Sequence, residues 1–469
     1  MVSVFSLKFS CIIFRIFSQK RKTLVPLQNK PINKKKILLV LPDGRIHKLK
    51  LWFGHSVSFR EAPLTLTTLA ALIPEDVPAH VEAADESVQS IPFHKEFDLV
   101  AISCLTGTST RAYEIAKHFA AKGSVIVLGG IHVTLRPEEA KEHAHAIVSG
   151  CAEEQWPKLL RDFRDGKLKK HYHGHPVPLN NYPIPKTSLL KKGAYMNPHV
   201  LFATRGCKSK CDFCSVPAAG LKWDTRPVEE VVEQIKLMGG KRIVFNDVSL
   251  LEDREYALSL FRALIPLRIT WGGLCTSTIA ADDEMLDLMA RSGCIFLLIG
   301  LESVNQKSLQ GMHKGFNKPD EYRILAQKLH KKKIILMGCF IFGSDHDTLD
   351  VFRDTVEMVD ELKIDVPRYA IYTPFPGTEA FRRLEAENRI LHTRWEHYDT
   401  QHVVFQPKNM TPQQLDEGFR WAYKQSYSIR SVWHRTKAIP SRFPFSFMGN
   451  LAYRIYLKRL DNENQRIFL

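Results

Sequence analysis

Three cysteines stand close together in one short segment of the chain. Cys207, Cys211 and Cys214 have the spacing C-x3-C-x2-C, and an apolar run that predicts a strand directly precedes them. Three thiolates can hold three irons of a cubane cluster and leave the fourth iron open to an outside ligand. A structural zinc site usually takes four ligands, and no fourth Cys or His stands nearby at that spacing. The spacing favours an iron–sulfur cluster; the alternatives are a zinc site completed by a distant ligand and three unrelated cysteines.

The elements expected to position these cysteines are short apolar runs that alternate with amphipathic helical stretches. This alternation predicts a parallel sheet covered by helices. The runs are too few for a full eight-stranded barrel, so we expect an incomplete (β/α)6 barrel. The predicted strands span residues 200–203, 242–245, 270–273, 296–299, 334–339 and 366–372.

An earlier series of runs predicts a second α/β unit in front of the barrel. It should form an open, doubly wound, flavodoxin-like sheet, in which ligands bind at the carboxyl ends of the strands. The predicted strands span residues 37–41, 97–102, 124–128 and 146–148, and two of the predicted helices span 64–73 and 109–121.

Changes in composition suggest five parts. A stretch with four prolines separates the two α/β units and predicts a linker. A helical period around residues 413–427 predicts a small helical region before the basic tail. The expected parts are a basic extension at 1–36, the front domain at 37–170, the linker at 171–195, the partial barrel at 196–390 and the C-terminal region at 391–469.

The positive charge of the chain is concentrated at its ends. Residues 1–36 hold nine Lys or Arg and no acid, and residues 430–469 hold eight against two acids, so the ends carry almost all of the net charge of +16. A nucleic-acid enzyme would carry basic surface in its body as well, so no nucleic-acid partner is expected. Basic, apolar-rich ends favour peripheral contact with an anionic membrane, with a solvated tail as the alternative.

The nine cysteines are mostly scattered, without the pattern of a secreted disulfide framework. The apolar stretch near the N-terminus is interrupted by Lys8 and Arg15 and has no cleavage site after it. We therefore expect a reducing, cytoplasmic location.

The cysteine segment resembles the signature of radical S-adenosylmethionine (SAM) enzymes, including the aromatic residue before the third cysteine, Phe213. The resemblance implies that Cys207, Cys211 and Cys214 bind a [4Fe–4S] cluster. The open iron would chelate the methionine moiety of SAM, and Phe213 would lie against its adenine. An electron from a donor such as flavodoxin or ferredoxin would then produce a 5′-deoxyadenosyl radical. In such chemistry the protein positions and shields what the cofactor makes.

Later strand ends resemble the subgroup of this family that carries an N-terminal cobalamin domain. Gly300-Leu301-Glu302-Ser303 resembles its motif after the fourth strand, and the segments 338–343 and 373–378 resemble its fifth and sixth strand ends. Asn246-Asp247 resembles an acidic pair, with Asn in place of the usual first Asp. The implied SAM-binding residues are Phe213, Asn246, Asp247, Glu302 and Ser303.

The front domain resembles the cobalamin-binding module of the same subgroup. Residues 129–133 resemble its G-G-x-H-V turn, and residues 150–154 a degraded G-E-G-E segment. The sequence has no D-x-H-x-x-G motif that would supply a histidine ligand to cobalt. The resemblance makes this absence expected, because cobalamin-binding members of this subgroup usually lack that ligand. The alternative is that the domain keeps the fold but does not bind cobalamin. The implied cobalamin-binding residues are Ser103, Thr106, Thr108, Gly129, Gly130 and His132.

Two reactions are typical of enzymes with both cofactors. One is methylation of an unactivated carbon; the other is oxidation, cyclisation or rearrangement without methyl transfer. Residues 395–399 and 407–415 resemble the hopanoid C-2 methylase and bacteriochlorophyll-modifying enzymes, which favours C-methylation of an apolar lipid-like or tetrapyrrole-like substrate. A non-catalytic iron–sulfur protein is the alternative from another class. The sequence leaves open the substrate, the carbon attacked and the oligomeric state.

Overall fold

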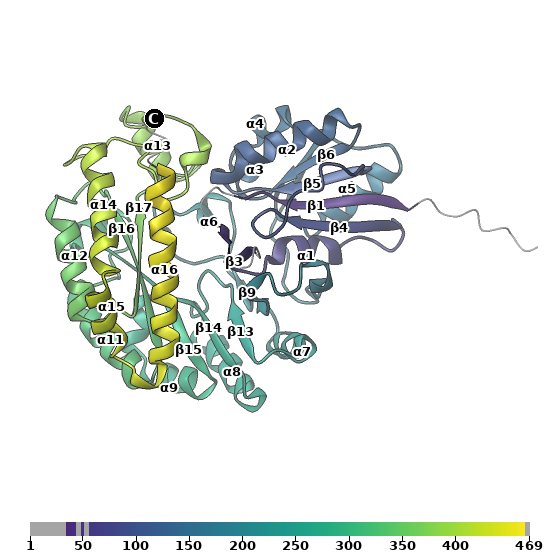
Figure 1. Cartoon of the computed structure of the whole chain (residues 1–469). Coiled ribbons are helices and arrows are strands. Elements are labelled where there is room, and N and C mark those ends of the chain that lie inside the picture. Colours follow the sequence, from purple (N-terminus) through teal and green to yellow (C-terminus); the bar gives the residue numbers. More distant parts are fainter. Residues whose placement is uncertain (1–33, 44–47, 51–55, 465–469) are drawn as a thin grey trace, which may run out of the picture.

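The computed structural model describes residues 34–43, 48–50 and 56–464. Almost all of the predicted basic extension lies outside these residues. Two α/β units lie beside each other, and a layer of helices at the end of the chain packs on the second unit (Figure 1). None of the helices in the described ranges is both long and apolar enough to cross a bilayer.

The first unit is a six-stranded, all-parallel sheet in the order β4-β1-β5-β6-β7-β8. Side chains alternate along β1: Leu38 and Val40 pack under α2 and α4, whereas Ile37 and Leu39 pack under α1 and α5. Helices therefore cover both faces, which confirms the predicted doubly wound fold. The bounds are β1 Lys35–Leu41, β4 Ala79–Asp85, β5 Leu99–Ser103, β6 Val125–Gly129, β7 Ala146–Gly150, β8 His171–Gly174, α1 Leu64–Ala71, α2 Ser109–Ala121, α3 Ile131–Leu135, α4 Pro137–Glu142 and α5 Gln155–Arg164.

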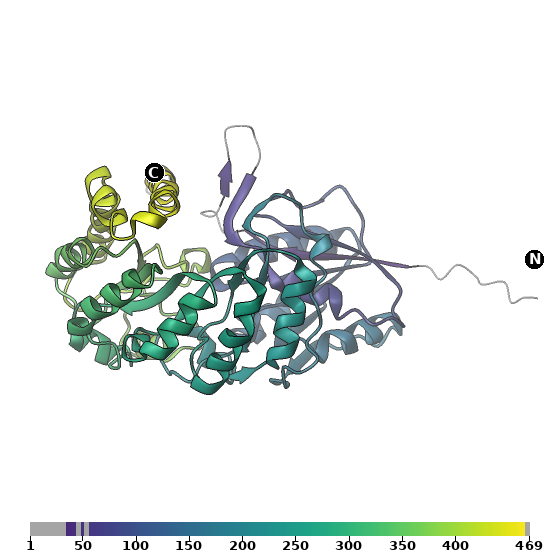
Figure 2. The ribbon, with the colours of Figure 1, turned by 90° about the horizontal axis from the view of Figure 1, so that it is seen from below.

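The predicted linker contains two strands. β8 (His171–Gly174) pairs with β7 as the last strand of the first sheet, so that sheet extends beyond residue 170. β9 (Tyr195–Asn197) pairs with β3 (Ser56–Glu61), which also forms a hairpin with β2 (Lys48–Lys50) (Figure 2). The prolines between β8 and β9 mark the irregular part of the connection.

The second unit is a partial barrel of six parallel strands in the order β10-β13-β14-β15-β16-β17, which confirms the predicted architecture. Along β16, Phe340 and Phe342 are buried under the outer helices, while Met337, Cys339 and Ile341 face inward and are partly accessible. The strands are β10 Val200–Leu201, β13 Arg242–Phe245, β14 Thr270–Cys275, β15 Cys294–Glu302, β16 Ile335–Phe342 and β17 Val366–Ile371. The helices around them are α7 Val228–Met238, α8 Arg254–Leu264, α9 Asp283–Arg291, α10 Gln306–Gly311, α11 Tyr322–Lys331, α12 Asp350–Glu361 and α13 Glu379–Ala386.

Three helices complete the chain: α14 (Pro412–Ser426), α15 (Ile429–Thr436) and α16 (Phe443–Asn464). Thr411 begins α14 with a capping box. Two tyrosines protect the backbone of the edge strand β17: the Tyr423 hydroxyl accepts from the Tyr369 N–H at 3.1 Å and donates to its carbonyl at 2.8 Å, and Tyr427 donates to the Pro367 carbonyl at 2.7 Å. Covering the edge in this way removes a site for unwanted strand pairing.

Candidate functional site

The cysteine segment is a loop at the carboxyl end of the first barrel strand. The short strand β11 (Thr204–Arg205) leads into it, pairs with β12 (Asp224–Thr225), and the helix α6 (Ser215–Ala218) follows it. Gly206 turns the chain with a φ of +79°, and a Cβ there would lie 2.4 Å from the Lys222 carbonyl oxygen. Both the positive φ and the close contact with Lys222 require glycine. Gly206 therefore sets the direction in which the chain enters the cysteine loop.

The three thiols differ in exposure but share one environment. Cys211 is buried, and Cys207 and Cys214 are half-buried. Burial raises the pKa of all three thiols, that of Cys211 to about 12. Iron bound here would favour the thiolate form, because a bound metal lowers the pKa of a coordinating thiol.

The three thiols are not gathered around one point. In the part of the chain that the structure describes, no three His, Cys, Asp or Glu side chains converge as ligands of one metal ion. Each iron of a cubane takes its own thiolate, so the sulfurs of a cluster site need not converge on one point. The loop is therefore compatible with the predicted cluster.

A buried ion pair stands beside the thiols. Lys314 Nζ lies 2.9 Å from Glu302 Oε1, and both side chains are about nine-tenths buried. The charge of Lys314 opposes the effect of burial on the pKa values of Cys211 and Cys214. Glu302 has a φ of +68° at a bulge in β15, and its carboxylate folds over Gly300, where a Cβ would lie 2.1 Å from Oε1. Gly300 is therefore needed to place this carboxylate at the inner face of the barrel.

The other predicted SAM-binding residues have different surroundings. The Phe213 ring is half-buried, with its centroid 6.1 Å from that of Tyr372. Asn246 is exposed. The Ser303 hydroxyl is buried and accepts from the Asn305 N–H at 3.0 Å. Phe213 lies within the cysteine loop itself, and the assignment of all these residues to SAM remains a prediction.

Asp247 is bound to the backbone that leads into the cysteine loop. It is 1% exposed, and its carboxylate accepts hydrogen bonds from the Ala203 N–H at 3.0 Å and from the N–H and hydroxyl of Thr204. Burial raises the pKa of Asp247 to about 7, although these hydrogen bonds oppose the shift. Asp247 therefore positions the start of the loop in the structure.

A second anchor was missed by sequence reasoning. Asp212, between two of the cysteines, is buried and accepts a 2.5 Å hydrogen bond from the Tyr372 hydroxyl. Arg383 on α13 lies 3.5 Å from the same carboxylate, and the Ala380 N–H donates to the Asp212 carbonyl at 3.0 Å. These contacts tie the loop to the last strand end of the barrel. The acidic residue between the second and third cysteines was the one feature of the sequence that could have indicated this anchor.

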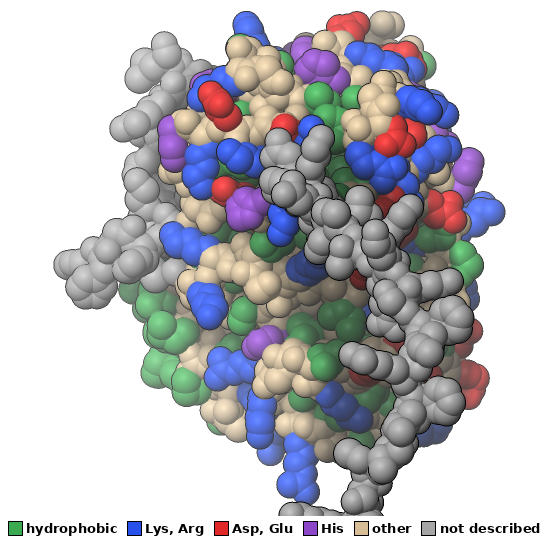
Figure 3. All heavy atoms as spheres, turned by 90° about the vertical axis from the view of Figure 1, so that its right-hand side faces the viewer, with side chains coloured by type: hydrophobic (Ala, Val, Ile, Leu, Met, Phe, Trp, Pro, Cys, Tyr) green, Lys and Arg blue, Asp and Glu red, His purple; other side chains and the backbone are tan. Residues whose placement is uncertain are grey.

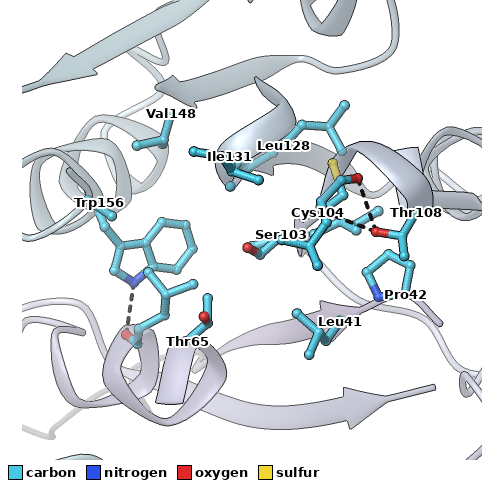
Figure 4. A pocket seen from close by; sticks show the side chains of 18 of the residues that line it. Leu41, Pro42, Thr65, Ser103, Cys104, Thr108, Leu128, Ile131, Val148 and Trp156 are labelled. Carbon is cyan, nitrogen blue, oxygen red and sulfur yellow. Dashed lines mark hydrogen bonds between the residues drawn. The ribbon is translucent and has the colours of Figure 1, made fainter. Parts of the chain in front are cut away.

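The first unit contains a cavity of about 410 Å³ at the carboxyl ends of its strands (Figure 4). It passes between the sheet and helices α1 and α5, where Trp156 is held by a 2.9 Å hydrogen bond from its indole N–H to the Leu69 carbonyl. Its volume and apolar lining suit an inserted organic group. Of the predicted cobalamin residues, Ser103, Thr108, Gly129 and Gly130 line this cavity.

Gly130 lines the cavity at a position where the neighbouring backbone leaves room for glycine only. Its φ is +100°, and a Cβ would lie 2.5 Å from the Cys104 carbonyl oxygen. The Thr108 hydroxyl is engaged with the backbone of Leu105 at 3.1 and 3.2 Å. This leaves the Ser103 side chain pointing toward the cavity (Figure 4).

Thr106 and His132 are not among the residues that line the cavity. His132 is fully buried: one ring nitrogen lies 3.3 Å from the Thr106 hydroxyl, and the other 3.3 Å from Glu139. Glu139 also accepts from the Trp395 indole N–H at 3.0 Å. His132 therefore belongs to a network that joins the first unit to the segment after the barrel.

The cavity and the cysteine loop are joined by one ion pair. Arg205, two residues before Cys207, lies 2.6 Å from Glu153, in the loop that follows the cavity residue Gly150. The two side chains are 14% and 17% exposed. The loops at the carboxyl ends of the two sheets therefore meet.

Three histidines gather after the barrel, close to the first unit. His397 stacks on His402 with ring centroids 4.6 Å apart, and His392 lies 5.3 Å from His397. Burial, together with the charges of His402, Arg394 and His392, lowers the pKa of His397 to about 4, while Glu396 opposes this shift. His397 is therefore neutral in the folded protein near neutral pH.

Because the pKa of His397 is lowered in the folded protein, we expect the folded state to lose stability as the pH falls. In the unfolded chain its pKa is about 6.5, so between about pH 6.5 and 4 the unfolded state binds a proton that the folded state does not. The free energy of unfolding should fall by about 1–2 kcal/mol more in the wild type than in His397→Gln between about pH 7 and 5. Urea unfolding followed by tryptophan fluorescence at both pH values measures this difference, and equal losses in the two proteins would refute it.

One α/β unit has a cavity at its strand ends and the other has a three-thiol loop at its strand ends, an arrangement that defines a class of protein with two candidate cofactor sites. Comparison with known proteins agrees. The Radical SAM superfamily matches residues 201–359, and the B12 binding domain matches residues 54–160.

Several curated proteins are similar over most of this chain. The bacteriochlorophyllide d C-12(1)-methyltransferase of Chlorobaculum tepidum is 30% identical over 360 residues, which cover 73% of this chain and 78% of that protein. The C-8(2)-methyltransferase of the same organism is 28% identical and covers 84% and 91%. The hopanoid C-2 methylase of Rhodopseudomonas palustris is 23% identical and covers 76% and 71%.

A solved structure has the same fold. The radical SAM methyltransferase TsrM from Kitasatospora setae, with cobalamin and a [4Fe–4S] cluster bound, has a TM-score of 0.59 at 17% identity and covers 76% of this chain and 78% of its own. The chain described here belongs to the cobalamin-dependent radical SAM methyltransferase family. It is an enzyme, and its cofactors are a [4Fe–4S] cluster, SAM and cobalamin.

Proposed function

We propose that this enzyme methylates a carbon atom of an apolar, lipid-like or tetrapyrrole-like substrate at the junction of its two α/β units. The observation that carries the proposal is the Arg205–Glu153 pair, because it brings the cavity loop against the strand that enters the cysteine loop. When bound, the cluster and SAM supply radical chemistry and the cobalamin supplies a methyl group. The protein's own residues then have to hold these groups close together and exclude water.

Specific residues support each cofactor in this proposal. Cys207, Cys211 and Cys214 bind the cluster, and Phe213 packs against the adenine of SAM. Glu302 offers a buried carboxylate to SAM, and Lys314 holds that carboxylate in place. Asn246, Asp247 and Ser303 complete the proposed SAM site, with Asp247 acting through the loop backbone. The cavity lined by Ser103, Thr108, Gly129 and Gly130 takes a part of cobalamin, and Thr106 and His132 support its wall.

The inner face of the barrel supports an apolar substrate. Its partly accessible side chains on β15 and β16 include Leu298, Met337, Cys339 and Ile341. On the neighbouring strand β17, Arg368 is opposite Cys339 and is exposed although Pro367 and Tyr369 on either side of it are buried. We infer that the substrate is largely apolar and carries an anionic group for this guanidinium.

The relatives support the same substrate class. Two of them are named for methylation of bacteriochlorophyllide d and one for methylation of a hopanoid. Anaerobic magnesium-protoporphyrin IX monomethyl ester cyclases are also similar, at 23–24% identity, which keeps cyclisation or oxidation as the second candidate reaction. A flavodoxin or ferredoxin is the proposed electron donor, and the enzyme is proposed to act in contact with a lipid surface.

One experiment tests the proposed reaction. The protein is purified without oxygen, reconstituted with iron, sulfide and hydroxocobalamin, and incubated with SAM, dithionite and a pigment and lipid extract. We expect stoichiometric corrin and release of 5′-deoxyadenosine, and label from methyl-labelled SAM should enter organic-extractable product. A cluster with 5′-deoxyadenosine release but no corrin and no label transfer would overturn methyl transfer in favour of oxidation or cyclisation.

The domain-joining ion pair gives a second prediction. Arg205→Gln leaves the largely buried Glu153 carboxylate without its arginine partner, at a cost of about 3 kcal/mol. Iron and corrin should stay bound, but methyl transfer should fall at least tenfold, by roughly the factor expected when reacting groups are misplaced. The measured quantity is methylated product per 5′-deoxyadenosine. Arg254→Gln, at an ion pair in which that arginine is 46% exposed, is the matched control; an unchanged ratio in Arg205→Gln would contradict the proposed role.

A further inference from the structure

The C-terminal helices expose a row of large apolar side chains. On α16, Phe445 is 54% exposed, Met448 62%, Leu451 39% and Ile455 44%. Their spacing of three, three and four residues places them along one side of the helix. Ser446 and Asn450, by contrast, are buried. Exposed contiguous apolar surface of this kind marks an interaction site.

The neighbouring helix continues this surface. Ile429 and Trp433, four residues apart on α15, are 70% and 49% exposed. The Trp433 ring lies 5.4 Å from Phe443, where α16 begins, so the two rows meet. We call the residues Ile429, Trp433, Phe445, Met448, Leu451 and Ile455 the C-terminal apolar rows. In Figure 2 the helices that carry them stand on one side of the barrel.

Basic residues predominate in this part of the chain. Residues 418–455 contain seven Lys or Arg and no Asp or Glu, although Arg420 pairs with Asp416 and the buried Arg435 pairs with Asp360. Lys437 Nζ lies 4.6 Å from the centroid of the Trp433 ring, and Arg430 is next to Ile429 in sequence. Over the first unit, by contrast, acidic and basic side chains are interspersed (Figure 3). The C-terminal helices therefore combine exposed apolar and aromatic side chains with exposed basic ones, those of Lys424, Arg430 and Lys437.

We propose that the C-terminal apolar rows dock the enzyme on an anionic lipid surface. Aromatic and aliphatic side chains enter the boundary between headgroups and acyl chains, and lysine and arginine pair with the lipid phosphates. A second copy of this chain fits less well, because a two-fold contact places the same basic segment against itself. The proposal stands on this surface alone and does not depend on which reaction the enzyme performs.

Vesicle binding tests the proposal directly. The reconstituted full-length enzyme is floated with vesicles of phosphatidylcholine alone and of phosphatidylcholine mixed with phosphatidylglycerol. We expect binding to the mixed vesicles that weakens as salt is raised, because salt screens the headgroup attraction. Equal binding to both vesicles, or binding to neither, would overturn the proposal. So would a salt-independent dimer that competes with vesicle binding.

Two pairs of substitutions separate the apolar from the ionic contribution. Phe445→Ser with Met448→Ser should weaken vesicle binding at least tenfold, whereas Leu237→Ser with Ile324→Ser, at exposed sites on α7 and α11, should leave it unchanged. Arg430→Gln with Lys437→Gln should weaken binding to the mixed vesicles by about thirtyfold, at roughly 1 kcal/mol per charge. Lys167→Gln with Lys241→Gln, exposed elsewhere, is the charge-matched control. Wild-type binding by both test pairs would overturn the assignment of this surface, and normal cluster loading checks that each variant is folded.

Discussion

Replacing Cys211 with Ala is expected to remove the iron–sulfur cluster and with it all turnover. A site-differentiated cubane needs three protein ligands, and Cys211 is the most buried of the three thiols. Iron and acid-labile sulfide should fall to background after anaerobic reconstitution. Release of 5′-deoxyadenosine from SAM should fall by at least about 1000-fold, since the chemistry belongs to the cofactor.

The control for this substitution is Cys294→Ala. Cys294 is also buried, but it lies at the start of β15 and packs in the barrel core. Its loss should cost about 1 kcal/mol of stability, as for a small buried side chain, and leave the iron content unchanged. A Cys211→Ala protein that retains its full iron content and turnover would contradict the assignment of the cysteine loop as the cluster site. Equal iron loss in both variants would show that the effect is general unfolding.

Gly129→Leu should empty the first unit of corrin while leaving the cluster in place. Gly129 ends β6 at the wall of the cavity, and a Cβ there meets nothing closer than 3.5 Å, so the backbone tolerates a side chain. The added isobutyl group then takes up cavity volume that cobalamin needs. Corrin affinity should fall by at least about 100-fold, an overpacking cost of roughly 3 kcal/mol.

The readouts of this variant separate the two units. Bound corrin should be lost, iron content should be normal, and SAM should still be cleaved to 5′-deoxyadenosine without methyl transfer. Gly449→Leu, at a helical glycine with open space around it, is the matched control and should behave as wild type. Full corrin occupancy in Gly129→Leu would mean that cobalamin uses another surface.

The architecture could be predicted from the sequence because it depends on local periodicity. Short apolar runs alternating with amphipathic stretches predicted both parallel sheets, and the helix predicted at residues 109–121 is α2 with the same bounds. The strand β8 was missed because its four residues, His171–Gly174, are polar and stand beside prolines. Pairing with β7, rather than composition, makes this segment a strand.

The site could be predicted in part. The three cysteines are neighbours in sequence, so their spacing favoured a cluster, and this assignment stays a prediction. Glu302 was predicted from a motif, but its partner Lys314 had no signal of its own. His132 was predicted as a cobalamin residue, yet the structure places it in a closed network with Thr106 and Glu139.

The sequence by itself determined the fold class and the family of the enzyme and predicted a cluster at the cysteine loop, because each depends on residues close together along the chain. The tertiary structure alone decided what holds that loop and what it faces. The hydroxyl of Tyr372 reaches Asp212 across 160 residues, and Trp395 reaches Glu139 across 256. The first contact depends on how the barrel brings its first and last strand ends together, and the second on how the two sheets pack, and no local pattern encodes either. The meeting of Arg205 with Glu153, and so of the two candidate sites, follows from the packing of the two sheets.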